Sequence, residues 1–383
     1  MGASRTTLTN ARLLTPDGFV DGWLSTEDGA IADLGAGAPP AGAGASVDLG
    51  GRTVLPGTVD THIHGGAGAA FTETDPERLR SIVEFNRANG ATTLVGGLVA
   101  ATPEDTLEQV RALADLADEG LIAGMFLEGP WISQNKHGAH DPALLRDPDT
   151  GEFDALLKAS RGHLRMVTIA PELPGALELV AAASSQEVTV AVGHTEATYD
   201  QARAAFDAGA TVATHLYNAM RPLDHREADP IRAKLTDQRV TVELINDGVH
   251  VHPAAAQVAF EAAGGDRISL VTDAMAATGL GDGEYTLGKL RVRVSGGEAR
   301  LVEDGTIASS TIVLPDAIRR AVETVEGVDL ETAARSATSV PARALGIEGV
   351  GELVEGYRAD LVVLDEDLSV AGVMYRGAWA EEL

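Results

Sequence analysis

The sequence of 383 residues predicts an α/β protein: a (β/α)₈ barrel with a small β-sandwich domain built from both chain termini. Three observations carry this prediction. Short apolar segments and helix-like segments alternate through the middle of the chain, as crossover helices between parallel strands require. β-like segments stand at both ends of the chain. Residues able to bind a metal or move a proton follow nearly every strand candidate, where a barrel of this kind forms its active site.

The two ends of the chain are expected to form one small domain. Short β-like segments separated by glycine turns open the chain, and a matching β-like stretch closes it at residues 361–364 and 372–375. We therefore assign residues 1–54 and 346–383 to the small β domain and residues 55–345 to the barrel.

The middle of the chain holds eight strand candidates, the number that a (β/α)₈ barrel needs. They are short, apolar and mostly β-branched, as expected for strands buried on both faces. The strand candidates are residues 53–60, 92–99, 121–127, 164–169, 188–192, 211–214, 239–245 and 268–272. Helical patterns fill gaps between them at residues 76–89, 103–119, 199–208 and 253–263.

One late segment interrupts this alternation. Residues 281–303 contain the run Leu-Arg-Val-Arg-Val, which alternates apolar and charged residues, followed by a Ser-Gly-Gly turn. This pattern predicts a β-hairpin inserted near the end of the barrel.

The composition excludes several classes of function. Acidic residues outnumber basic ones, 57 to 29, and the formal net charge of −28 argues against a nucleic acid or an anionic membrane as partner. A small phosphorylated substrate stays compatible, because one or two Arg side chains suffice to hold a phosphate. The chain has no Cys, so any metal must be held by His and carboxylate ligands. Without a transmembrane-length apolar run or a signal-like N-terminus, the sequence predicts a cytoplasmic protein.

Candidate metal ligands begin at the first barrel strand. His62 and His64 end an apolar strand two residues apart, a spacing that points both imidazoles to the same face of the strand. A lone His is more often structural than a ligand, but a His-x-His pair in this position favours a metal pair. Glu128 follows the third strand candidate, where a buried carboxylate is costly unless it is paired or coordinated.

Later strand ends carry further candidates. His194 and His215 each end a strand of their own, and such His and carboxylate sets suit Zn²⁺ or Fe²⁺ with one position left open for water. Asp273 ends the eighth strand candidate; we interpret it as the general base, the alternative being a partner that orients a ligand His. His140 lies on a glycine-containing loop placed to reach over the site, and His250 follows a strand and a glycine turn.

The motifs around these residues resemble a known family. Residues 55–66, Leu-Pro-Gly-Thr-Val-Asp-Thr-His-Ile-His-Gly-Gly, are similar to the signature of the amidohydrolase superfamily, which also fits dihydroorotases, hydantoinases and deaminases. Five further motifs narrow the resemblance: Leu-Glu-Gly-Pro-Trp, Lys-His-Gly-Ala-His-Asp-Pro, Thr-His-Leu-Tyr-Asn-Ala-Met, Asn-Asp-Gly-Val-His and Val-Thr-Asp-Ala-Met. Together and in order they resemble the N-acetylglucosamine-6-phosphate deacetylases over essentially the whole chain.

This resemblance implies a hydrolase that deacetylates N-acetylglucosamine 6-phosphate, in amino-sugar catabolism or cell-wall recycling. It also implies a role for each matching residue. Glu128, His194 and His215 would hold the essential divalent metal, and Asp273 would act as acid and base. His140 would polarise the acetyl carbonyl beside the metal.

The same resemblance implies the contacts to the substrate, a phosphorylated amino sugar. Arg226 would grip the 6-phosphate and would reach across a homodimer interface into the neighbouring active site. The loop formed by Thr306, Ile307, Ala308 and Ser309 would close over the sugar. The other residues expected at the sugar site are Ala139, His140, Asn218, Ala219, Asp247 and His250.

Two features depart from a uniform family pattern. Some members lack the His-x-His pair and work with one ion, whereas His62 and His64 predict a second metal site here, with Glu128 as the bridge. We expect one or two divalent ions per subunit, Zn²⁺ first, with Fe, Co or Mn as alternatives. Ser309 stands where the family often has a glycine, which permits backbone dihedral angles that serine avoids.

Two other interpretations stay open at this stage. The chain could be another amidohydrolase, a cyclic amidase or a deaminase, with the same barrel and metal. Arg226 and the pair of Asn218 and Ala219 favour a phosphosugar over those substrates. The chain could also be a catalytically silent sensor, although such proteins usually lose a ligand or the acid/base and this set is complete.

Overall fold

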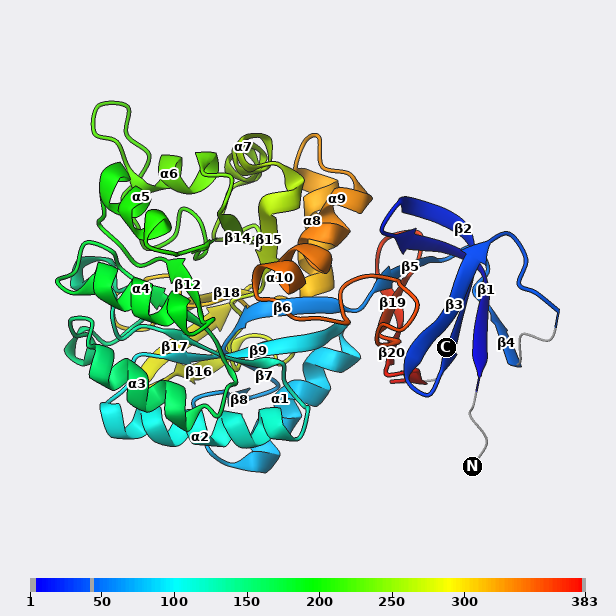
Figure 1. Cartoon of the computed structure of the whole chain (residues 1–383), viewed down its shortest axis with the longest axis horizontal. Coiled ribbons are helices and arrows are strands. Elements are labelled where there is room, and N and C mark those ends of the chain that lie inside the picture. Colours follow the sequence, from blue (N-terminus) through cyan, green and yellow to red (C-terminus); the bar gives the residue numbers. More distant parts are fainter. Residues whose placement is uncertain (1–4, 42–44, 381–383) are drawn as a thin grey trace.

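The computed structural model describes residues 5–41 and 45–380, and it divides into a barrel and a smaller strand-rich domain (Figure 1). The strand-rich domain lies to one side of the barrel and is built from the first and last described segments of the chain. The remaining residues, 1–4, 42–44 and 381–383, fall within the ranges predicted for the small domain and lie outside the described residues. The predicted fold class is confirmed.

Eight parallel strands form the barrel, paired in the order in which the chain enters them. The strands are β6 (Thr58–Ile63), β9 (Ala91–Val99), β10 (Gly124–Glu128), β11 (Leu164–Ile169), β12 (Thr189–Val192), β13 (Val212–Ala213), β14 (Thr241–Ile245) and β15 (Ile268–Val271). The first and last strands meet just beyond β15, where the backbone N–H of Asp273 donates to the carbonyl of His62 over 2.8 Å. Most of their residues are buried on both faces of the strands, which fits their content of Val, Leu, Ile and Ala.

Ten α-helices among the described residues complete the barrel and its C-terminal extension. They are α1 (Pro76–Ala88), α2 (Pro103–Asp118), α3 (Thr150–Ala159), α4 (Ala176–Ser185), α5 (Tyr199–Asp207), α6 (Pro230–Thr236), α7 (Pro253–Ala263), α8 (Leu314–Thr324), α9 (Leu330–Ser336) and α10 (Ser339–Ala344). Side chains cap several of them: Asp75 accepts from the N–H of Glu77 before α1, and Thr102 from that of Asp105 in α2. None of these helices is long and apolar enough to cross a bilayer.

Both chain ends contribute to the sheet of the small domain. Its strands are β1 (Thr6–Thr15), β2 (Gly18–Glu27), β3 (Ala30–Ala36), β4 (Ala45–Asp48), β5 (Thr53–Pro56), β19 (Leu361–Leu364), β20 (Val370–Tyr375) and β21 (Ala378–Trp379). Antiparallel pairing of β5 with β19 joins the two ends of the chain. Apolar side chains from both ends form one core, with Leu8, Leu24, Val54, Leu361 and Val363 among its buried members.

The strand predicted at residues 53–60 is two strands, and this part of the prediction is wrong. β5 belongs to the small domain, whereas β6 opens the barrel, and Gly57 separates them. A Cβ at Gly57 would lie 2.2 Å from the Thr92 hydroxyl and 2.9 Å from the Asp360 Cβ, so only glycine lets the two domains approach here. The apolar pattern runs on without a gap across this boundary.

A small antiparallel sheet follows the barrel strands in sequence. It contains β16 (Gly283–Leu287), β17 (Leu290–Ser295) and β18 (Glu298–Leu301), so the region predicted as a hairpin has a third strand. The N–H of Ala308 donates to the carbonyl of Ala299, which ties the loop after β18 to this sheet. Two short strands, β7 (Gly65–Gly66) and β8 (Ala69–Ala70), pair just after the His-x-His motif.

Candidate active site

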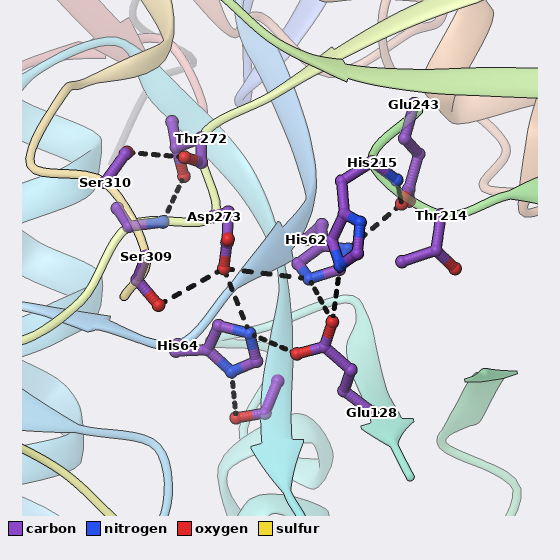
Figure 2. A network of polar contacts seen from close by, with 12 residues as sticks. His62, His64, Glu128, Thr214, His215, Glu243, Thr272, Asp273, Ser309 and Ser310 are labelled. Carbon is purple, nitrogen blue, oxygen red and sulfur yellow. Dashed lines mark hydrogen bonds and ion pairs between the residues drawn. The ribbon is translucent and has the colours of Figure 1, made fainter. Parts of the chain in front are cut away.

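Six titratable side chains converge where the barrel strands end. One lies in β6, one directly follows β6, and one ends β10, while the other three each follow their strand by two residues, after β12, β13 and β15. The six are His62, His64, Glu128, His194, His215 and Asp273. Figure 2 shows five of them turned toward one another around a common centre. The structure therefore brings together the five predicted metal ligands and Asp273, the predicted acid/base.

The backbone turns sharply where the strands end in the site. His194, His215 and Asp273 have φ angles of +46°, +22° and +48°, in or near the left-handed region that residues with a Cβ seldom adopt. Ala219 and Ser309, at the rim, share this feature with φ of +48° and +62°. Such conformations cluster at functional sites, where the surrounding structure fixes them.

Glu128 lies between two groups of histidines. Its Oε1 is 2.9 Å from the Nε2 of His194 and 2.9 Å from the Nε2 of His215, and these two nitrogens are 3.0 Å apart. Its Oε2 is 3.0 Å from the Nε2 of His64. One carboxylate thus faces both groups, which is the geometry of a ligand that can bridge two cations.

The second group contains His62, His64 and Asp273. The Asp273 Oδ1 lies 3.2 Å from the Nε2 of His64 and 3.8 Å from the Nε2 of His62. Both Nε2 atoms are buried against these carboxylates, and that of His62 has no hydrogen bond within the described part of the chain. A buried imidazole nitrogen without a hydrogen bond is costly, and the donor set of imidazole nitrogens and carboxylate oxygens suits Zn²⁺ or a similar divalent ion. The residues present therefore fit a metal.

The electrostatics of the cluster keep its carboxylates charged. Burial alone would raise the pKa of Glu128, but the neighbouring His62 and His194 outweigh it and hold that pKa well below its usual range. The pKa of Asp273 is also lowered, because its bond to His64 and the charge of His62 outweigh burial. In return, the carboxylates raise the pKa of His64 to about 9 against the effect of burial.

His140 approaches the same centre from the loop after β10. Burial lowers the pKa of His140 to about 4, so its imidazole is neutral near pH 7. Its Nδ1 accepts a hydrogen bond of 3.3 Å from the backbone N–H of Ala100, which places the ring proton on Nε2. That nitrogen lies 3.5 Å from the Glu128 Oε2, so His140 presents a hydrogen-bond donor beside the candidate metal.

A cavity of about 260 Å³ opens above the cluster. The residues that line it are His64, Val99, Glu128, Gly138, Ala139, His140, His194, His215, Asn218, Ala219, Ile245, His250, Asp273, Leu287, Thr306, Ile307 and Ser309. Most residues expected at the sugar site lie in this lining. Asp247 lies behind it and holds His250, with its Oδ2 2.7 Å from the ring Nδ1.

Two further expected site residues, besides Asp247, lie outside the cavity lining. Ala308 is fully buried and packs with the small antiparallel sheet behind the loop, so its side chain supports the wall of the cavity. Arg226 is exposed on the segment between β13 and α6 and is absent from the cavity lining. Within the described chain, the lining contains neither Arg nor Lys.

Sequence reasoning missed two buried acids that support the cluster. Asp60 accepts from the Thr272 hydroxyl over 2.5 Å and so links β6 to the segment that carries Asp273; burial raises its pKa to about 6. Glu243, on β14, places its Oε2 3.0 Å from the Nδ1 of His62. A signal for Glu243 was present, because a charged residue inside a strand buried on both faces needs a buried partner.

Comparison with known protein families matches residues 53–380 to the amidohydrolase family. The chain belongs to the amidohydrolase family. An N-acetylgalactosamine-6-phosphate deacetylase of Escherichia coli O157:H7 is 38% identical over 375 residues, covering 96% of this chain and 97% of that protein. An N-acetylglucosamine-6-phosphate deacetylase of Vibrio furnissii is 33% identical, over 87% of this chain and 84% of that protein.

Solved structures of this family are similar over the full length. A structure of the N-acetyl-D-glucosamine-6-phosphate deacetylase of Mycobacterium smegmatis with N-acetyl-D-glucosamine-6-phosphate is 48% identical, with a TM-score of 0.95 and full coverage of both chains. The predicted resemblance and the predicted class, a metal-dependent amide hydrolase, are confirmed. Membership of the amidohydrolases implies a divalent metal, and the cluster around Glu128 is where this chain can hold one.

Proposed function

We propose that this amidohydrolase hydrolyses the acetamide of N-acetyl-D-glucosamine 6-phosphate, releasing acetate and D-glucosamine 6-phosphate. The observation that carries the proposal is that Asp273 and His140 both contact the metal-ligand cluster around Glu128 and both line the same cavity of about 260 Å³. Relatives that match nearly the whole chain are named as deacetylases of phosphorylated amino sugars, which supports this substrate class.

A divalent ion would be held by Glu128, His194 and His215, and a second by His62, His64, Glu128 and Asp273. Zn²⁺ is the ion we expect, since the site offers imidazole and carboxylate donors and the chain has no Cys. When bound, such an ion supplies a Lewis acid that lowers the pKa of a water molecule and polarises the amide carbonyl.

Asp273 and His140 perform the proton transfer and the stabilisation of charge. Asp273, whose lowered pKa keeps it ionised, accepts the proton of the attacking water. The neutral His140 donates its Nε2–H to the oxygen that becomes negative in the tetrahedral intermediate. Asp273 then returns the proton to the departing amine, and acetate leaves.

The last part of the proposal concerns how the 6-phosphate is bound and how the subunits assemble. The cavity lining lacks an Arg or Lys, so a charge for the 6-phosphate must come from outside it. We assign this charge to Arg226 of a second subunit in a homodimer, working in the cytoplasm in amino-sugar catabolism or cell-wall recycling. A cyclic amidase, a deaminase or a silent sensor is not favoured, because the chain-length relatives are deacetylases and the ligand and acid/base set is complete.

The proposal is tested with a panel of substrates. Purified protein is incubated with N-acetylglucosamine 6-phosphate, its galactosamine epimer, unphosphorylated N-acetylglucosamine and dihydroorotate, and free acetate and ring opening are measured. We expect fast acetate release from a phosphorylated sugar and at least a hundredfold lower kcat/KM without the phosphate, since a charge-assisted contact is lost. Turnover of dihydroorotate without acetate release would overturn the proposal and return the chain to the cyclic amidases.

A further inference from the structure

Glu243 is a buried carboxylate to which the proposed reaction gives no role. It lies on β14 with its residue 1% exposed, among strands whose other side chains are almost all apolar. Its Oε2 lies 3.0 Å from the Nδ1 of His62 and 3.4 Å from the backbone N of His215. Figure 2 shows Glu243 reaching from its strand toward the rear of the His62 ring, on the side away from Glu128.

The His62 side chain is the partner that makes this burial tolerable. An ionised carboxylate buried without a partner is strongly unfavourable. Within the described residues, His62 is the only charged or titratable side chain in ion-pair contact with Glu243. Lys234 is also buried and attracts Glu243 over a longer distance, without an ion-pair contact. The Glu243–His62 contact therefore accounts for a charged group in this place.

His62 differs from the other histidines of the cluster in what lies behind its ring. The Nδ1 of His64 faces the carbonyl of Gly97 at 3.3 Å, and the Nδ1 of His194 faces the carbonyl of Lys136 at 2.8 Å. Only His62 has a carboxylate in that position among these three. A carboxylate behind a ligand imidazole fixes the tautomer and makes the ring a better donor to a metal.

We infer that Glu243 is a positioning residue for the second metal ion of this centre. Its carboxylate accepts the Nδ1–H of His62, so that the lone pair on the opposite nitrogen points at Glu128 and Asp273. This Nε2 is the atom left buried without a hydrogen bond, 3.5 Å from Glu128 and 3.8 Å from Asp273. Glu243 reaches His215 only at its backbone N and does not contact its ring. Its effect on metal affinity is therefore confined to the ion that His62 binds.

The inference rests on the two-ion centre of the proposed function, and metal binding tests it separately from turnover. Metal-free protein is titrated with Zn²⁺ by calorimetry, and the bound ions per chain are counted after gel filtration. Wild-type protein should bind two ions. Glu243→Gln keeps the side-chain size and an acceptor oxygen but removes the charge; it should keep the tighter ion and bind the other 10–100-fold more weakly.

Two further variants show whether Glu243 acts through His62. His62→Ala should weaken the same ion, and adding Glu243→Gln to it should cost little more, because the two residues share one contact. Glu261→Gln, on the exposed face of α7, is the matched control and should bind both ions as the wild type does. Unchanged affinity for both ions in Glu243→Gln would overturn the inference, as would equal weakening of both.

A measurement on unaltered protein covers the case in which Glu243→Gln fails to fold. In crystals soaked with Zn²⁺, anomalous scattering should place an ion about 2.0–2.1 Å from the Nε2 of His62, with Glu243 still bonded to Nδ1. A His62 ring bound through Nδ1, or wild-type protein with one ion per chain, would overturn the inference and leave acetate release unaffected. Two bound ions with no acetate release would overturn the proposed function and leave the role of Glu243 intact.

Discussion

Single residues at the strand ends determine the chemistry of the site. His194, His215 and Asp273 take positive φ angles, and conformations of this kind cost on the order of 1–3 kcal/mol each. Backbone hydrogen bonds hold one of them: the N–H of Asp273 donates to His62 over 2.8 Å, and its carbonyl accepts from Ser310 over 2.7 Å. The barrel therefore stabilises a backbone that turns these candidate ligand and acid/base side chains toward one centre.

The first prediction concerns the acid/base. Asp273→Asn keeps the shape of the side chain but cannot accept the proton of the attacking water, so kcat should fall by about 10²–10⁴-fold. Bound metal should fall by no more than one ion per chain, since Glu128, His194 and His215 remain. The measurement is kcat for acetate release with metal content on the same sample. Near-normal turnover would exclude Asp273 as the base.

The second prediction concerns the donor to the oxyanion. His140→Phe keeps a flat ring in the same buried space but removes the Nε2–H, so kcat should fall by about 10²–10³-fold with a much smaller change in KM. Steady-state kinetics at saturating substrate separates the two parameters. If KM rises while kcat is preserved, His140 binds substrate and does not stabilise the intermediate.

The sequence predicted the candidate ligands that the structure brings together, but not the residues that support them. His62, His64 and Glu128 were recognisable because metal-binding side chains stood at the ends of apolar strands. Asp60 and Glu243 contact the site through hydrogen bonds between strands that are distant in sequence. The spacing of residues along the chain does not predict such contacts. Ser309 takes a φ of +62°, the conformation glycine favours, so the substitution of serine preserves the bend of the loop.

At the scale of elements, the buried strands provide the rigid support, and the residues at their ends and in the following loops provide the side chains of the candidate site. β6, β12, β13 and β15 are buried throughout or nearly so, and the side chains that face the cavity come from their last residues and the loops beyond. The sequence analysis did not predict helices α3, α4, α6, α8, α9 and α10. In α4, six of the ten residues are Ala or Ser without a clear polar face, which gives a weak periodic signal. Strand boundaries were predicted to within a few residues, apart from the break at Gly57.

The third prediction concerns the buried Lys234 of α6. Burial lowers the pKa of Lys234 to about 7, below its ordinary value of 10.5. Between these two values the unfolded chain keeps this proton while the folded chain loses it, so this group makes stability rise with pH. Below about pH 7 the buried charge of Lys234 destabilises the folded state to its full extent. Above pH 10.5, the ordinary pKa of lysine, this destabilisation is absent.

Lys234→Met removes that charge and keeps an unbranched side chain against Met220. The variant should be more stable than the wild type at pH 7, and the difference should shrink by pH 9.5. Urea unfolding at both values measures it, with the exposed Lys158→Met of α3 as the control that should show no such trend. A difference that is independent of pH would mean that Lys234 folds with its charge retained.

At the scale of the whole molecule, the cavity holds the candidate metal ligands and the proposed acid/base, and its lining in the described chain contains no Arg or Lys for a phosphate. Arg226 is exposed outside it, on a segment whose backbone is held by Asp224, with the N–H of Arg226 2.6 Å from the Asp224 Oδ1. The fold predicted from the sequence is confirmed, yet one chain by itself does not show how the phosphate is bound. A second subunit provides the missing charge in our account.

The fourth prediction tests that assembly. Arg226→Ala should raise KM strongly, and Asp273→Asn should be nearly inactive. When the two are unfolded and refolded together, heterodimers combine an intact Asp273 in one subunit with an intact Arg226 from the other. Random pairing then restores about a quarter of the wild-type sites. Recovery no greater than the sum of the separate variants would place Arg226 in its own subunit's site or outside both.

The most direct test of the central claim is the rate of acetate release from N-acetylglucosamine 6-phosphate as a function of metal bound per chain. Protein stripped with a chelator is reloaded stepwise with Zn²⁺, and the rate and the metal content are measured on each sample. Our account predicts no release from the stripped protein and recovery in step with ions bound, absent in Asp273→Asn. Full activity in the stripped protein, or none in the fully loaded protein, would contradict it.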